Sequence, residues 1–176
     1  HNHLVGRRAM GQYNLERSAR IALESMDAAG VKLNLLMPMP QTVGQNIQLY
    51  FEDLLPIVEK YPNRFAALGG GGSLNVMIQQ AIEEGHVTPG MEEKFDSRAS
   101  ELVRKGAVGF GEMTAEHFSM TKSHPYEKAP PDHPLFLRLA DLAAEYDLPV
   151  DIHMEAIPEE MPIPSRFQLP PNPRIL

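Results

Sequence analysis

The sequence predicts an α/β protein built on parallel strands. Short apolar runs of strand length recur along the chain, at 31–37, 64–68, 107–113 and 148–154. Longer stretches with apolar residues at helical spacing separate them, and a strand that returns parallel to its neighbour needs such a crossover. Hydrophobic residues make up 43% and charged residues 22% of the 176 residues, as in folded globular domains. We therefore expect a single domain over 1–176, with a proline-rich tail over 154–176.

The first helix is expected over 14–29 and the first strand over 31–37. Asn14 suits an N-cap, because its side chain can accept a hydrogen bond from a free N–H of the first turn. Gly30 stands where helices often end in the left-handed conformation. The run that follows is apolar and ends before Pro38, which predicts a buried strand.

Three more helices are expected before the third apolar run, over 46–60, 73–84 and 88–105. Pro56 lies inside the first of them and is expected to kink it. Ser73 has the character of an N-cap, and Thr88 followed by Pro89 has the pattern of an N-cap and first helical residue. The glycines at 69–72 predict a tight exit from the strand at 64–68, where backbones approach closely.

The last units begin with the strand at 107–113, which is expected to end near Glu112. A long loop carrying His117 and His124 follows. A helix is expected over 132–146, with His133 at its start, and the strand at 148–154 completes the predicted sheet.

Charge and composition exclude several classes of function. The net charge of −7 argues against binding to a phosphate backbone, and the absence of cysteine excludes disulfides, thiolate metal sites and cysteine nucleophiles. No apolar run has the length of a membrane span and no signal peptide is visible, so we expect a soluble, cytoplasmic protein. The expected ligand is therefore a small molecule, rather than nucleic acid or membrane.

Ionisable residues gather at the expected strand ends, where parallel α/β proteins carry their chemistry. Glu112 and His153 close two of the predicted strands, and His1 and His3 would end a preceding strand whose body is not in the sequence. Residues two apart on a strand point to one side, so His1 and His3 can face one metal. Three imidazole ligands with an open position are typical of catalytic zinc, which lowers the pKa of bound water towards about 7. Glu112 could complete or bridge such a site.

These motifs resemble the amidohydrolase superfamily of metal-dependent TIM-barrel hydrolases. The segment His1-Asn2-His3-Leu4 is similar to the His-x-His signature of the first barrel strand. The segments that end in Glu112 and His153 are similar to the fourth and fifth strands. The likeness is closest to the amidohydrolase-related branch, which includes hydrolases and decarboxylases. It implies a partial (β/α)8 barrel, roughly the first five β/α units with parallel strands, without the later histidine and aspartate of the family.

The resemblance implies a hydrolase that uses a metal-activated water on a C–N or C–O bond of a small molecule. Its expected metal ligands are His1, His3, Glu112 and His153, with Glu112 also catalytic. Zinc is the expected metal and manganese the alternative. The residues expected to contact substrate are His117, His124 and Glu155.

Other interpretations of the same residues stay open. A non-oxidative decarboxylase could use the same scaffold. The chain could also be an inactive fragment that survives as an oligomer, because an open sheet leaves an unpaired edge and an exposed apolar face. For that reason we expect a homo-oligomer. At the level of residues, His153 could be a core histidine, Glu112 could pair with an arginine, and the pair His1 and His3 could be a terminal feature without a biological metal.

Overall fold

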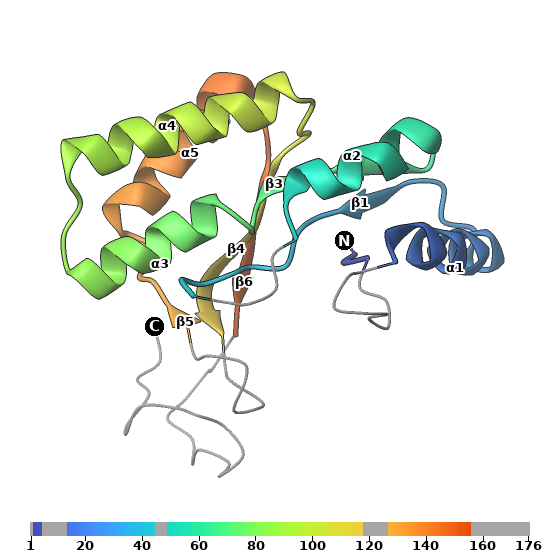
Figure 1. The fold of residues 1–176 in the computed structure, drawn as a ribbon, viewed down its shortest axis with the longest axis horizontal. Helices are drawn as coiled ribbons and strands as arrows, with labels where there is room; N and C mark the ends of the chain where they lie inside the picture. Colours follow the sequence, from blue (N-terminus) through green and yellow to red (C-terminus); the bar gives the residue numbers. More distant parts are fainter. Residues whose placement is uncertain (1, 5–13, 45–48, 118–126, 156–176) are drawn as a thin grey trace, which may run out of the picture.

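The computed structural model describes residues 2–4, 14–44, 49–117 and 127–155 of the chain, drawn in colour in Figure 1. These residues form a mixed α/β structure with parallel strands, as the sequence predicted. The strands do not close into a barrel within the described ranges. No helix in these same ranges is long and apolar enough to cross a membrane.

Parallel strands follow one another in the order of the sequence. Asn2 forms a parallel bridge with Leu36 at the end of β1 (Asn34–Leu36), and β1 pairs with β2 (Phe65–Ala67). Further along the chain, β3 (Gly69–Gly70) pairs with β4 (Phe110–His117), and β4 pairs with β6 (Val150–Met154). These pairs belong to two sheets, and because the pairs named are parallel, the carboxyl ends of the paired strands lie at one edge in each sheet.

The helices lie where the sequence predicted, except that α2 begins at residue 51 and not at the expected 46. In α1 (Leu15–Ala29) the side chain of Asn14 accepts a hydrogen bond from the Arg17 N–H at 2.9 Å, and Gly30 takes the left-handed conformation. The other helices are α2 (Phe51–Lys60), α3 (Leu74–Glu84), α4 (Pro89–Arg104) and α5 (Pro134–Tyr146). Ser73 precedes α3 but makes no capping bond there, and its hydroxyl accepts a hydrogen bond from the Arg98 side chain.

Helix α4 is central to the packing. It contacts both α3 and α5, and Figure 1 shows these three helices together on one side of β4 and β6. Its Phe95 and Leu102 are fully buried, and so is Phe110 at the start of β4. Burial of each such side chain contributes roughly 1.5–3 kcal/mol, so this packing fixes the strands that carry the candidate site.

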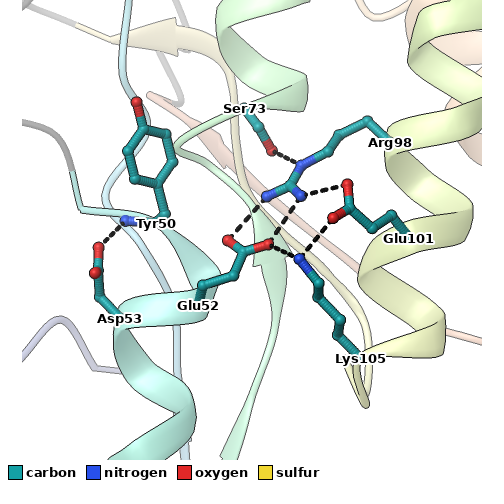
Figure 2. A network of polar contacts seen from close by, with 7 residues as sticks. All are labelled: Tyr50, Glu52, Asp53, Ser73, Arg98, Glu101 and Lys105. Carbon is teal, nitrogen blue, oxygen red and sulfur yellow. Dashed lines mark hydrogen bonds and ion pairs between the residues drawn. The ribbon is translucent and has the colours of Figure 1, made fainter.

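A network of charged groups connects α2 to α4, as Figure 2 shows. The guanidinium of Arg98 donates to both oxygens of Glu52, at 2.9 and 3.0 Å, and to Glu101 at 2.8 Å. Lys105 reaches the same two carboxylates, at 2.9 Å from Glu52 and 2.6 Å from Glu101. Paired guanidinium and carboxylate groups of this geometry have defined orientation, so the network connects α2 to α4 through side chains.

The main correction to the sequence analysis concerns β4. We expected this strand to end near Glu112, but it begins at Phe110 and runs to His117, so Glu112 lies inside it. The polar segment after Met113 is held in extended form by β6 and by β5 (Glu127–Lys128), which pairs antiparallel with residues 116–117. The sequence gives little sign of this pairing, because residues 114–117 lack the apolar character of a buried strand.

Candidate metal centre

Three potential metal ligands converge where β4 and β6 end. His117 is the last residue of β4, His153 lies near the end of β6, and Glu155 follows β6 directly. His117 Nδ1 is 2.9 Å from His153 Nε2 and 3.2 Å from Glu155 Oε1. The third side of this triangle, from His153 Nε2 to Glu155 Oε1, measures 3.1 Å. We call these three residues the His–His–Glu cluster.

The His–His–Glu cluster could hold a metal ion. Ligand atoms about 2.0–2.1 Å from a tetrahedral zinc ion lie roughly 3.4 Å from one another. The distances of 2.9, 3.1 and 3.2 Å within the cluster are only slightly shorter. Two imidazoles and one carboxylate also form a donor set that zinc prefers. The three side chains are half-buried, so a further position can remain open to solvent.

Strand pairing brings the cluster together. Thr114 of β4 is the register partner of His153 of β6, and the Glu155 N–H donates to the Glu116 carbonyl at 3.3 Å. On the other side of β4, His117 is the register partner of Glu127. The two histidine rings then meet edge to face, with centroids 4.7 Å apart. Residues far apart in the sequence therefore reach one point through backbone pairing.

Glu112 lies between His153 and His3. It is 3% exposed, and its Oε1 is 2.8 Å from His153 Nδ1 while its Oε2 is 2.8 Å from His3 Nε2. One ring nitrogen of His153 thus contacts Glu112, and the other contacts the remaining members of the cluster. Glu112 presents one oxygen to each histidine, which is compatible either with orienting His153 or with bridging two metal positions.

The carbonyl of Met37 determines the protonation of His3. It lies 3.0 Å from His3 Nδ1 and can only accept a hydrogen bond, so this nitrogen carries a proton. His3 Nε2 faces the Glu112 carboxylate and needs a proton as well. Burial lowers the pKa of His3, but the hydrogen bonds with Glu112 and Met37 outweigh it and raise the pKa on balance. Metal coordination through His3 Nε2 would require the loss of that proton.

The carboxylates around His153 favour positive charge at this position. Burial lowers the pKa of His153, but its hydrogen bonds to Glu155 and Glu112 raise it on balance. In the same way, burial raises the pKa of Glu112, while the contacts with His3 and His153 lower it on balance. The site is therefore suited to a cation, whether a proton or a metal ion.

The backbone packs tightly behind Glu112. A Cβ atom on Gly71 would lie 2.5 Å from the Pro38 carbonyl oxygen and 3.0 Å from that of Glu112. Only glycine allows this approach, and it brings the exit of β3 against β4. The close backbone approach predicted for 69–72 is confirmed at Gly71, but Gly69 and Gly70 form β3 and are not the exit of a strand at 64–68.

A cavity of about 700 Å³ lies between α1, residues 2–4 and the start of β1. Among the described residues of the candidate centre, His3 alone lines it. The cavity therefore reaches the centre from the side of His3 and not from the side of the His–His–Glu cluster.

The structure places some of the predicted site residues together and corrects the position of others. His1 and His124 lie outside the described residues. His3, Glu112 and His153, expected as ligands, do lie in one connected group. His117 was expected on a loop, which is wrong, because it closes β4. Together with Glu155 it was expected to contact substrate, and the structure places both side chains beside His153 as potential metal ligands.

Several buried polar residues near the centre were missed by the sequence analysis. Asn75, Gln79 and Glu127 are each at most 6% exposed. Asn75 and Gln79 stand one turn apart on α3, beside Leu74 and Ile78 on its buried face. Asn75 and Gln79 could have been found from the sequence, because they are polar residues on the apolar face of a predicted helix. Glu127 could not be found in this way, because its strand β5 follows a segment that was expected to be a loop.

Comparisons with known proteins identified no relative of this chain. No protein-family model, curated protein or solved structure matched it. The likeness to amidohydrolases rests on the residues quoted above, and it stays a prediction.

Proposed function

We propose that this chain belongs to a metal-dependent hydrolase that acts on a C–N or C–O bond of a small molecule. The observation that carries the proposal is the convergence of His117, His153 and Glu155 at the carboxyl ends of two parallel strands. Functional residues of parallel α/β proteins gather at this edge. The parallel strands in sequence order are consistent with the first units of a (β/α)8 barrel, which we propose as the complete scaffold.

In this proposal the His–His–Glu cluster holds the ion, with zinc favoured by the two imidazole donors and manganese as the alternative. A divalent ion bound there would act as a Lewis acid and lower the pKa of a coordinated water. Glu112 accepts a hydrogen bond from His153 Nδ1 and so leaves Nε2 to face the cluster. Carboxylates that orient a ligating histidine in this way commonly strengthen metal binding.

A second arrangement keeps the ligands that the resemblance implies. Glu112 would then be a ligand itself, shared between a position beside His3 and a position beside His153. The two arrangements predict different stoichiometries and different effects of changes at His3. Both place the metal at the same edge of the sheet.

Metal analysis of the purified chain tests the proposal. After dialysis against zinc, the wild-type protein is expected to retain metal, and His117→Ala and His153→Ala are expected to lose it. His86→Ala is the control, because His86 is exposed and hydrogen-bonded only to the nearby Glu84 carbonyl among the contacts described. Hydrolysis of chromogenic esters and cyclic amides by the loaded protein, lost in the same two variants, would support the reaction class.

The outcomes separate the arrangements. A single equivalent of zinc that persists in His3→Ala supports the His–His–Glu cluster alone. A second equivalent that disappears in His3→Ala supports a shared Glu112. A wild-type protein that retains no zinc or manganese would contradict the proposed function.

A further inference from the structure

The buried amide of Asn75 connects α3 to both histidine-bearing parts of the centre. Its Oδ1 accepts a hydrogen bond from the Thr114 N–H at 2.8 Å, and Thr114 is the register partner of His153. Its Nδ2 lies 3.4 Å from Glu127 Oε2, and Glu127 is the register partner of His117. One side chain thus contacts the two residues that stand beside the two imidazoles.

Thr114 needs these contacts because β4 loses its neighbour at this point. β3 ends at Gly70, opposite Gly111, so β4 has no β3 residue beside it further on within the described ranges. The pairing with β6 is also irregular on both sides of Met113 and Thr114. Gln79 donates to the Thr114 carbonyl at 3.3 Å, while Asn75 takes the N–H. Side chains of α3 therefore replace the missing strand edge and satisfy backbone groups that would be costly to leave unpaired.

Asn75 itself is held firmly. It is fully buried, and its Nδ2 also donates to the Gln41 carbonyl at 3.0 Å. Glu127 is 4% exposed, and burial raises the pKa of its carboxyl group. A fully bonded buried amide of this kind has a single orientation, which makes it suited to fixing the position of its neighbours.

We propose that Asn75 is a positioning residue of the metal centre: by holding Thr114 and Glu127, it sets the separation of the His153 and His117 imidazoles. The inference rests on the proposed function for its metal, although the spacing of the histidines can be measured without one. Among the described contacts, Asn75 reaches none of the three side chains of the His–His–Glu cluster, and it acts through β4 and β5.

The test uses Asn75→Ala and the isosteric Asn75→Asp, with Ile57→Ala as the control. Ile57 is buried in α2, which packs mainly against β2 and α1, so its truncation destabilises the fold away from β4 and β5. Asn75→Asp keeps an oxygen that accepts from the Thr114 N–H, but it puts a second oxygen in place of the Nδ2 donor that faces Glu127. Both Asn75 variants are expected to weaken zinc binding about 10- to 100-fold, as loss of supporting contacts commonly does. Ile57→Ala is expected to leave zinc affinity unchanged at a temperature where every variant is folded.

Imidazole nitrogen resonances of the metal-free protein give the second readout. Those of His117 and His153 are expected to shift in the Asn75 variants and to stay in place in Ile57→Ala. Adding Glu127→Gln to Asn75→Asp exchanges donor and acceptor, and should partly restore both readouts. Asn75 variants with unchanged resonances and unchanged zinc affinity would overturn the inference. Absence of zinc from the wild-type protein would refute the proposed function instead, and the resonances would still decide the role of Asn75.

Discussion

Glu52 offers a quantitative test of the ion-pair network between α2 and α4. Its carboxylate contacts Arg98 and Lys105, as Figure 2 shows. The hydrogen bonds from Arg98 are the main cause that lowers the pKa of Glu52 from 4.5 to about 2; burial opposes this, and Lys105 lowers the pKa further. Replacing Glu52 by Gln removes the charge and keeps the size of the side chain.

The expected loss of stability follows from that pKa. A change from 4.5 to about 2 corresponds to at most roughly 3.4 kcal/mol, at about 1.36 kcal/mol for each tenfold change in proton affinity. The Glu52 side chain is 33% exposed and that of Lys105 is 38% exposed, so solvent screens the interaction. Surface ion pairs typically contribute less than about 1 kcal/mol each. We therefore expect Glu52→Gln to lower the free energy of unfolding by about 1 kcal/mol at neutral pH.

The stability contributed by Glu52 is expected to fall as the pH is lowered. A carboxyl group whose pKa is lowered in the folded protein contributes stability above its unfolded pKa of 4.5, and this contribution is lost as the pH falls towards about 2. Urea unfolding of wild type and Glu52→Gln between neutral pH and pH 3 should show the difference shrinking below about pH 4.5. Glu59→Gln, an exposed change in the same helix, is the control. A difference that stays constant over this range would refute the electrostatic account.

Two further changes test the surroundings of the site and the first helix. Gly71→Ala should displace the backbone at Pro38 and Glu112, cost about 1–3 kcal/mol and weaken zinc binding. Gly90→Ala, where an added Cβ would meet no atom within 4 Å, should do neither. Equal zinc affinity and equal urea midpoints in these two variants would contradict the close approach. Asn14→Ala should lower the free energy of unfolding by about 1 kcal/mol through loss of the α1 cap, and Asn14→Ser should retain most of it. If the serine variant unfolds as readily as the alanine variant, the side-chain cap does not stabilise α1.

Local chemistry made the helices predictable from the sequence. Asn14 and Gly30 delimit α1 because capping and left-handed backbone depend on a few neighbouring residues. The apolar runs likewise predicted parallel strands. Burial follows this pattern only in part, because Leu33, Ile152 and Met154 are exposed. His153 lies on β6, the last strand of the described chain, as the sequence predicted.

Only the tertiary structure decided how the site is assembled. His117 belongs to β4 because β5 and β6 pair with the polar end of that strand, and such pairing joins residues distant in the sequence. The contact of Glu112 with both His3 and His153, and that of Asn75 with Thr114, likewise depend on register. The sequence by itself determined the helices and the apolar parts of the parallel strands, but not β5 or the polar end of β4. Which histidines and carboxylates meet was decided by strand register and helix packing, because these depend on contacts across the whole fold and not on local residue pattern.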